Sequence, residues 1–259
     1  MKDSKTIMNV VILAGEILLH NGAEIFRVQE TMTKIAEAYK TASFDVYVIS
    51  NGIFVSVSEN GVHYSTGIKH IPLSPVHLGR VAAVNDLSRK IVEGKYTLHE
   101  AYDRLKEIER IPYKPKWFQI MCSGVGSGCF CYLLGGNVFD SMTAFLAGII
   151  LYVFILKVSD KNMSKMLINI LGSGLVTLCG LVFFHIGMGD QLDKIIIGSI
   201  IPLVPGVPLT SSVRDFLNSD YLSGTIRLID AVLIAFCIAI GVGGMLKVWG
   251  SLFVGGMMG

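Results

Sequence analysis

Five long apolar stretches in the second half of the 259-residue sequence constrain its fold more than any other feature. They run approximately over residues 117–135, 139–157, 166–185, 194–213 and 226–247. Each approaches the roughly 20 residues that a helix needs to cross the hydrocarbon core of a bilayer. Only 16% of the chain is charged and 52% is hydrophobic, whereas a soluble domain has about 25% charged residues. We therefore predict an all-α bundle of about five transmembrane helices over residues 116–259.

Residues 1–115 are rich in charged side chains and predict a separate cytoplasmic domain of the α+β class. Apolar residues recur at helical spacing over residues 6–39, with a break expected at Asn21–Gly22. The period changes to two in the runs that begin at Phe44, Ile53 and Val62, which predicts about three antiparallel strands. Asn60–Gly61, between the last two runs, is typical of a hairpin turn.

Two further helices are predicted after the strands. Ser74 and Pro75 match an N-cap and a first helical position, and Gly94 is expected to end this helix. Its apolar stripe consists of Leu78, Val81, Val84, Leu87 and Ile91. Thr97 and Glu100 match a capping box that opens the second helix, whose inner face would consist of Ala101, Leu105 and Ile108. Pro112 and Pro115 would then form the linker to the membrane helices.

Charges in the loops predict how the chain crosses the plasma membrane. Lys and Arg precede the first apolar stretch, occur in and beside the loop of residues 158–165 and recur at Arg214 and Arg227, whereas the loop of residues 135–140 has neither. Cytoplasmic loops of membrane proteins carry an excess of Lys and Arg. We therefore expect a multi-pass protein of the inner membrane with a cytoplasmic N-terminus and a C-terminus outside.

The fourth apolar stretch contains three prolines and a glycine close together, namely Pro202, Pro205, Gly206 and Pro208. A proline inside a helix removes a hydrogen bond and clashes with the preceding turn, so this spacing predicts an interrupted span. Transporters often place substrate at such interruptions, because the N-terminus of a half-helix presents N–H groups to an anion. A structural kink without a binding role is the alternative.

Polar residues follow the prolines and complete the candidate pathway for a substrate or an ion. They are Ser212, Arg214, Asp215, Asp220, Ser223, Arg227 and Asp230. Arginine can hold a carboxylate through two parallel hydrogen bonds, and an acidic group in a span can carry protons. The alternative for Arg214 and Arg227 is that they only contribute to the positive charge of the cytoplasmic side.

A second charged motif, Glu24, Arg27 and Glu30, lies in the predicted first helices. Its carboxylates could serve the acid–base chemistry of a membrane-tethered hydrolase. Ordinary ion pairs are the simpler explanation, since Glu24, Arg27 and Glu30 are three residues apart and Lys34 follows Glu30 by four. No Gly-x-Ser-x-Gly nucleophile elbow occurs. We predict that the chain is not an enzyme and has no catalytic residues. A membrane-anchored sensor or scaffold is an alternative, although a mere anchor would not need an interrupted span.

The composition predicts no cofactor, metal or nucleic acid as a partner. The five cysteines all fall in apolar stretches, and no Cys-x-x-Cys pair is present to start a zinc site. The net charge of +2 is small, and no basic stripe interleaved with aromatic residues occurs.

The sequence resembles the threonine/serine exporter (ThrE) family over essentially the whole chain, and four stretches carry the resemblance. They are residues 22–28, 52–55, 84–89 and 205–227. The resemblance implies a proton-coupled exporter of small polar carboxylates, either amino acids of the threonine and serine type or dicarboxylates such as succinate. Short members of that family work with a second, small multi-span membrane subunit, so the implied partners are this subunit, the substrate and the lipid bilayer; a homo-oligomer is left open.

The sequence departs from the pattern of that family at several positions. Ser219 stands where a glycine is usual, Gln29 and Asp230 where glutamate is common, and Ser211–Ser212 where an asparagine is frequent. These departures bear on the substrate and not on the family.

Overall fold

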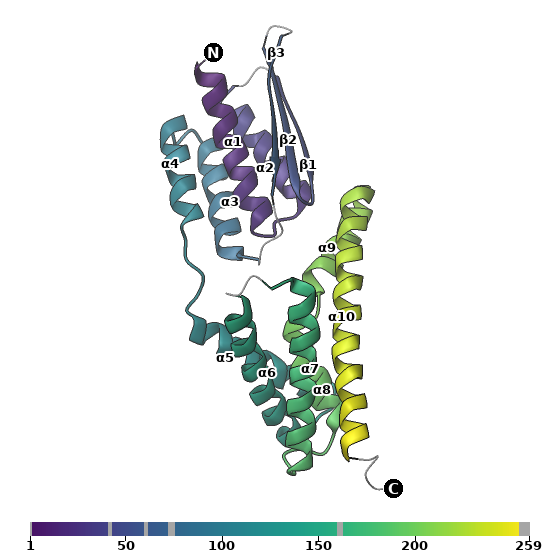
Figure 1. Ribbon diagram of the computed structural model, residues 1–259. Helices are drawn as coiled ribbons and strands as arrows, with labels where there is room; N and C mark the ends of the chain where they lie inside the picture. Colours follow the sequence, from purple (N-terminus) through teal and green to yellow (C-terminus); the bar gives the residue numbers. More distant parts are fainter. Residues whose placement is uncertain (1, 41–42, 60–61, 72–75, 160–162, 254–259) are drawn as a thin grey trace. The chain divides into compact units, whose positions relative to one another are not determined.

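The computed structural model describes residues 2–40, 43–59, 62–71, 76–159 and 163–253 (Figure 1). The chain divides into two compact units. The first consists of Met1–Tyr113 together with Thr210–Arg227, and the second consists of Lys114–Leu209 together with Leu228–Gly259. The predicted division into residues 1–115 and 116–259 stays a prediction.

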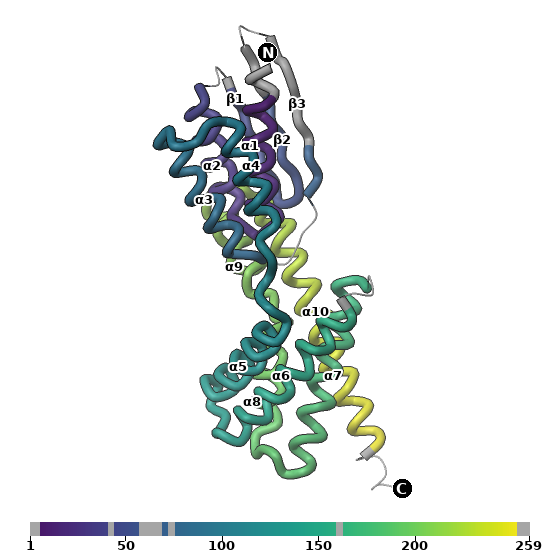
Figure 2. The backbone as a smooth tube through the Cα atoms, turned by 90° about the vertical axis from the view of Figure 1, so that its left-hand side faces the viewer, coloured from purple at the N-terminus to yellow at the C-terminus, as the bar shows by residue number. Residues whose placement is uncertain are grey.

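The first unit has the predicted order of helices, strands and helices. Its elements are α1 (Lys2–His20), α2 (Ile25–Ala38), β1 (Ser43–Ile49), β2 (Gly52–Glu59), β3 (Val62–His70), α3 (Leu78–Val92) and α4 (Leu98–Glu109). The three strands form an antiparallel sheet in the order β1-β2-β3, with Val46 of β1 opposite Val55 of β2. Figures 1 and 2 show α1 at the centre, with α2, α3 and α4 around it and the sheet on the remaining side.

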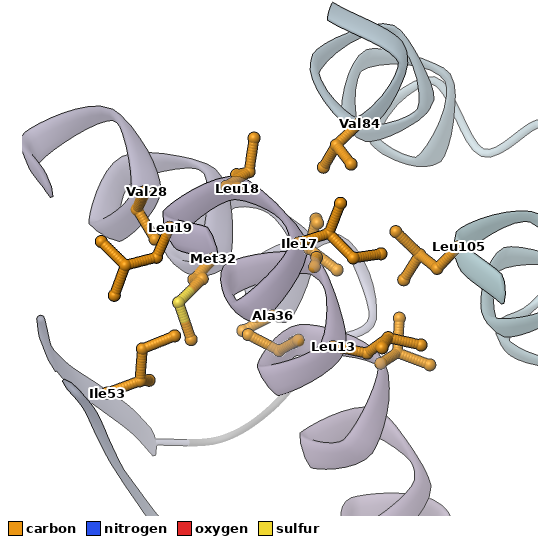
Figure 3. Close-up of a cluster of buried hydrophobic side chains, with 14 of the residues drawn as sticks. Leu13, Ile17, Leu18, Leu19, Val28, Met32, Ala36, Ile53, Val84 and Leu105 are labelled. Carbon is orange, nitrogen blue, oxygen red and sulfur yellow. The ribbon is translucent and has the colours of Figure 1, made fainter. Parts of the chain in front are cut away.

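The core of the first unit forms around α1. Side chains of this helix, among them Leu18, meet Met32 of α2, Ile53 of β2 and Leu105 of α4 in one buried cluster (Figure 3). Gly15 of α1 allows this approach, because a Cβ atom at this position would overlap the Sδ atom of Met32. Burial of a large aliphatic side chain contributes about 1.5–3 kcal/mol, so the apolar stripe of α1 is a main source of stability for this unit.

The structure confirms most of the predicted starts and ends of these helices. The break after α1 lies where it was predicted, with Gly22 at a φ of 84°. Thr97 and Glu100 form the expected reciprocal capping box at the start of α4. Ser74–Pro75 and Asn60–Gly61 lie outside the described residues. The helix expected from Pro75 begins at Leu78, and its N-cap is His77, whose side chain accepts the N–H of Arg80 at 3.2 Å.

One member of the predicted apolar stripe of α3 is not in the core. Val84, Leu87 and Ile91 are buried and Val81 is half-buried, but Leu78 is 71% exposed. The reason is that α3 begins only at Leu78, so this side chain extends from the first turn beyond the layer that packs on α1.

All elements from Lys116 to Phe253 are helices, including the parts of α9 and α10 that belong to the first unit. The elements are α5 (Lys116–Leu133), α6 (Val138–Ser159), α7 (Lys165–His185), α8 (Leu192–Ile200), the short 3-10 helix η1 (Ile201–Leu203), α9 (Gly206–Leu217) and α10 (Tyr221–Phe253). Among the described residues, α6, α7 and α10 are long and apolar enough to cross a membrane. The bent pair of α8 and α9 brings the number to four if the pair is one span. The predicted fifth span, over α5, stays a prediction, because Lys116, Gln119 and several Gly and Ser residues make this helix less apolar.

Small residues allow the helices of the second unit to approach closely. A Cβ atom at Gly128 of α5 would lie 2.9 Å from the carbonyl oxygen of Ser141 in α6, and one at Gly198 of α8 would lie 2.9 Å from the backbone of Cys131. In contrast, Gly243 and Gly244 of α10 face open space within the described part of the chain. Helices in lipid associate largely through close contacts at small residues. Gly128 and Gly198 therefore account for helix packing within this chain.

A tight turn joins α9 to α10 and places Ser219 at a φ of 62°. The N–H of Ser219 donates to the carbonyl oxygen of Phe216 at 3.0 Å, and the N–H of Asp220 donates to that of Asp215 at 2.9 Å. These two bonds are those of a Schellman motif, in which the residue at the position of Ser219 adopts the left-handed conformation. Glycine adopts this conformation without steric cost, which is a physical reason for the glycine that the family resemblance implies at this position.

We predict that Ser219→Gly stabilises the protein. Relief of the left-handed strain outweighs the extra freedom of glycine in the unfolded chain, and we expect a gain of roughly 0.5–1 kcal/mol. For a chain of this size, this gain corresponds to a rise of roughly 1–4 °C in the apparent melting temperature of the detergent-solubilised protein. Asn218→Gly is the matched control, since Asn218 is not among the described residues with positive φ and should lose stability. A melting temperature that falls equally for both variants would contradict the assignment of strain to Ser219.

Candidate transport site

The helix formed by the fourth apolar stretch is interrupted, as its prolines predicted. α8 passes into η1, and Val204 then adopts an extended conformation with φ −60° and ψ 129° before α9 begins at Gly206. The two apolar segments on either side of the break meet at an angle of 65°. The main chain therefore leaves helical geometry over Val204 and Pro205.

Only one interruption results from three prolines, because the chain stays helical through Pro202 and because Pro208 lies where a missing N–H costs little. Pro202 is in the first positions of η1. The carbonyl oxygen of Pro205 accepts the N–H of Leu209 at 3.1 Å, so Pro208 falls in the first turn of α9. N–H groups of a first turn have no acceptor within their own helix, and proline is tolerated there. The expectation that each of the three prolines would remove a hydrogen bond is therefore wrong for Pro208.

A cavity of about 440 Å³ opens beside the first part of the interruption, in the second unit. Its lining consists of Lys114, Phe118, Gln119, Cys122, Ser123, Gly126, Tyr152, Ile201 and Pro202. Tyr152 donates from its hydroxyl group to the Oε1 atom of Gln119 at 2.7 Å, which fixes a polar edge in an otherwise apolar lining. Lys114 supplies the one charge of the lining. The cavity can therefore accept a small ligand with an anionic end.

Asp215 of α9 and Arg227 of α10 form a buried ion pair within the first unit. Their side chains are 5% and 12% exposed, and Nη1 of Arg227 lies 3.4 Å from Oδ2 of Asp215. This distance is long for a charge-assisted hydrogen bond, which is usually about 2.7–2.9 Å. The Oδ2 atom accordingly has no hydrogen-bond partner in the described part of the chain. A buried carboxylate that is paired but not fully hydrogen-bonded retains much of its desolvation cost.

Further polar residues of the α9–α10 hairpin (Thr210–Arg227) lie near this pair. Asp220 caps α10, since its Oδ1 atom accepts the N–H of Ser223 at 3.2 Å. Ser212 and Ser223 are fully buried, and the Oγ atom of Ser223 has no hydrogen-bond partner among the described residues. Unsatisfied buried polar atoms are rare and require an explanation. Two of the described unsatisfied atoms, Asp215 Oδ2 and Ser223 Oγ, belong to this hairpin, and each can take a further hydrogen bond.

The polar residues predicted after the prolines do not all form one cluster. Arg214 forms an ion pair with Glu24 at the start of α2, within the first unit. Asp230 forms an ion pair with Lys165 of α7 at 3.1 Å, within the second unit. The sequence could not predict these partners, because the pairs join residues from distant parts of the chain.

The motif of Glu24, Arg27 and Glu30 contains only one of the predicted helix ion pairs. Lys34 contacts Glu30 at 2.6 Å, as the four-residue spacing predicted, and its hydrogen bond and charge lower the pKa of Glu30. No ion pair of Arg27 is present in the parts of the chain that the structure describes, so the expected pairs with Glu24 and Glu30 are wrong. The reason is that Glu24 precedes the first turn of α2 and turns to Arg214 instead.

Glu24 and Arg27 line a second cavity, which lies entirely in the first unit. Its volume is about 220 Å³, and its lining consists of Leu18, Gly22, Ala23, Glu24, Arg27, Leu78, Val81 and Asn85. The sequence-based interpretation treated Glu24 and Arg27 as a motif on one helix. It did not place Leu78 and Asn85 of α3 beside them.

Asp140 is a buried carboxylate that our interpretation of the sequence missed. Its Oδ1 atom accepts the N–H groups of Asp190 and Gln191 at 2.7 and 3.1 Å, and its Oδ2 atom accepts that of Asn137 at 2.9 Å. Asn137 in turn accepts the N–H of Asp140 at 2.8 Å. The spacing of Asn137 and Asp140 before an apolar run was the available signal of this cap. The carboxylate of Asp140 accepts hydrogen bonds from main-chain N–H groups of its own unit. These bonds join the start of α6 to the loop before α8.

The cysteines and acidic residues of the described chain provide no metal site. No group of three or more His, Cys, Asp or Glu side chains in this part of the molecule could hold a metal ion. Cys131 and Cys237 are buried as expected for apolar packing residues, whereas Cys122 and Cys129 on α5 are exposed.

Comparison with known proteins places the chain among transporters. The family model described as "Putative threonine/serine exporter" matches residues 9–249. A "Probable succinate transporter subunit YjjP" of Klebsiella aerogenes is 23% identical over 96% of this chain and 96% of its own length. A "Probable threonine/serine exporter" of Mycobacterium tuberculosis is 21% identical over 92% of this chain but 45% of its own length. A "Threonine/serine exporter" of Corynebacterium glutamicum is 22% identical, also over 92% of this chain, and over 50% of its own length.

No solved structure matches the chain significantly. The names of the family and of these relatives describe transporters and not enzymes. Because the family model matches nearly the whole sequence, and because the chain has the apolar helices of a membrane protein, it belongs to the threonine/serine exporter family.

Proposed function

We propose that this chain is one subunit of a secondary, proton-coupled exporter of small polar carboxylates. The observation that carries the proposal is the interrupted helix at Val204–Pro205, followed within one helix by the buried pair of Asp215 and Arg227. A mere membrane anchor has no use for a broken span or for a buried charge pair. A transporter uses both, the first to interrupt regular structure near its substrate and the second to respond to a change of charge.

The carboxylate is the chemical group that the named activities of the relatives share. Threonine and serine each carry one and succinate carries two, and the cavity beside Pro202 offers Lys114 as a cation with Tyr152 and Gln119 as hydrogen-bonding groups. A lysine ammonium group can pair with a carboxylate without fixing its orientation. We therefore propose this cavity as a part of the substrate path.

A second multi-span membrane subunit completes the exporter in our proposal. The YjjP relative is named as a subunit, and the two relatives named as threonine/serine exporters are about twice as long as the matched region. Gly243 and Gly244 of α10 have no close neighbour in the described chain, so this part of α10 can receive another helix.

Efflux in a knockout strain tests the function directly. Cells loaded with labelled L-threonine, L-serine or succinate should export at least one of them when this chain and its partner subunit are both expressed, and neither subunit should suffice alone. The rate is normalised to the amount of protein in the membrane. Full export by this chain without any partner would contradict the two-subunit proposal, and no export of any of the three compounds by the pair would contradict the exporter proposal.

We expect Asp215→Asn to separate proton coupling from transport. A proton on Asp215 neutralises the carboxylate and releases Arg227 from its ion pair, whereas asparagine keeps the size but cannot take up a proton. In proteoliposomes with both subunits, the variant should lose the stimulation of transport by a pH gradient. Exchange of labelled for unlabelled substrate without a gradient should persist.

Asp193→Asn is the matched control for this experiment. Asp193 lies in the first turn of α8 with its side chain 66% exposed, so the same chemical change should leave the response to a pH gradient intact. If Asp215→Asn responds to the gradient as the parent protein does, Asp215 is not the proton-carrying group.

The proposed orientation has the N-terminus in the cytoplasm and the C-terminus outside. Val138, at the start of α6 and 63% exposed, is a better labelling site than Asn137, whose side chain is engaged by Asp140 and Asp190. In a background without native cysteines, an impermeant thiol reagent should modify Val138→Cys in intact cells. Lys161→Cys, in the next predicted loop and outside the described residues, should react only after the membrane is opened. The opposite pattern would reverse the orientation.

A further inference from the structure

The cavity of the first unit brings together charges from two helices that are far apart in the sequence. Glu24 and Arg27 belong to the start of α2, and Asn85 belongs to α3. Three different polar groups therefore border one space: a carboxylate, a guanidinium group and an amide. The remaining lining is apolar and comes from Leu18, Leu78 and Val81, with the small residues Gly22 and Ala23.

Arg27 is available to a ligand. Its side chain is exposed, and it forms no ion pair with an acidic residue in the described ranges of the chain. A guanidinium group can hold a carboxylate by two parallel hydrogen bonds, and the amide of Asn85 can donate a further one. Arg27 and Asn85 of the cavity lining thus favour a carboxylate.

Glu24 favours a cation at the same cavity, and the structure shows a cation in contact with it. The guanidinium group of Arg214 forms an ion pair with the carboxylate of Glu24. This carboxylate is only one-third exposed, so it gains from a positively charged partner more than a free surface group would. An ammonium group in the cavity would compete with Arg214 for Glu24.

The size and the apolar lining limit what the ligand can be. A volume of about 220 Å³ accommodates a molecule of a few heavy atoms and excludes a nucleotide. Leu78, which the first turn of α3 leaves 71% exposed, and Val81 offer contacts to a short apolar group. A dicarboxylate fits less well, because its second carboxylate would meet the like charge of Glu24.

We propose that this cavity binds a free α-amino acid, with its carboxylate on Arg27 and Asn85 and its ammonium group on Glu24. The choice of an amino acid among small zwitterions rests on the proposed export function. The site is separate from the substrate path beside Pro202, since all its lining belongs to the first unit. Binding displaces Arg214 from Glu24. The cytoplasmic concentration of the amino acid therefore determines how often Arg214 of α9 is released from this ion pair.

Equilibrium binding to the purified full-length chain in detergent tests the inference. L-threonine, L-serine and L-alanine are the probes, and succinate is the comparison ligand. Arg27→Gln and Glu24→Gln should each weaken amino-acid binding at least about tenfold, the effect expected when one charge-assisted contact is lost. The matched controls are Arg104→Gln and Glu107→Gln, which make the same changes in an ion pair of α4 away from the cavity lining and should keep the parent affinity.

Arg214→Gln separates contact with the ligand from loss of the ion pair. If Glu24 binds the ammonium group, this variant removes the competitor and should bind the amino acid at least as tightly as the parent chain does. If Glu24→Gln acts only by breaking the pair with Arg214, Arg214→Gln will show the same loss, and the proposed contact is wrong.

Three results would overturn the inference. They are no binding of any of the three amino acids at millimolar concentration, unchanged affinity in both cavity variants, and succinate binding as tight as that of the amino acids. A chain that supports efflux with its partner but gives one of these results loses only this cavity site, and its exporter function stands. A chain that binds amino acids as predicted but supports no efflux keeps the site and loses the proposed function.

Discussion

The need to satisfy main-chain hydrogen bonds in an apolar environment is the constraint on which the rest of this structure depends. In lipid, unpaired N–H and C=O groups are costly, so a chain with this many apolar stretches must form helices there. Departures from helix are correspondingly few among the described residues of the second unit. At two of these departures, particular residues limit the number of unpaired main-chain N–H groups. Asp140 satisfies the N–H groups of Asn137, Asp190 and Gln191 at a loop, and the prolines around Val204 lie mostly where a helix has no donor to lose. The interruption at Val204–Pro205 therefore stands out as the one place in this apolar stretch where regular structure ends.

The buried charges lie in the hairpin that comes after this interruption in the sequence. α9 and α10 meet in a tight turn, and the turn brings Asp215 and Arg227 together in a place that is nearly closed to solvent. A charge pair of this kind contributes little to stability, because the cost of removing two charges from water offsets their attraction. Its presence, with unsatisfied atoms on Asp215 and Ser223, is more readily explained by a change of charge during function than by folding.

The first unit has a different physical basis from the second. Its stability comes from an ordinary hydrophobic core around α1, with a capping box and surface ion pairs at the helix ends, as in a soluble domain. It nevertheless contains the end of α9 and the start of α10, and the ion pair between Glu24 and Arg214 joins these segments to α2. A change at the cavity beside Glu24 thus has a physical route to the helix that also contains Asp215.

The sequence by itself determined the local features: the apolar stretches, the three strands, the break after α1, the capping box at Thr97 and the interruption among the prolines. These depend on hydrophobic spacing and on residues with special backbone geometry, which act over a few neighbouring positions. Only the tertiary structure decided which charges meet. Glu24 and Arg214 are 190 residues apart, and Asp230 finds Lys165 and not Arg227. The tertiary structure also decided that Leu78 is exposed beside a cavity and that Asp140 is buried. Apart from the local cap of Asn137 and Asp140, such outcomes depend on how whole helices pack, and the spacing of residues along one helix does not specify which other helix it meets.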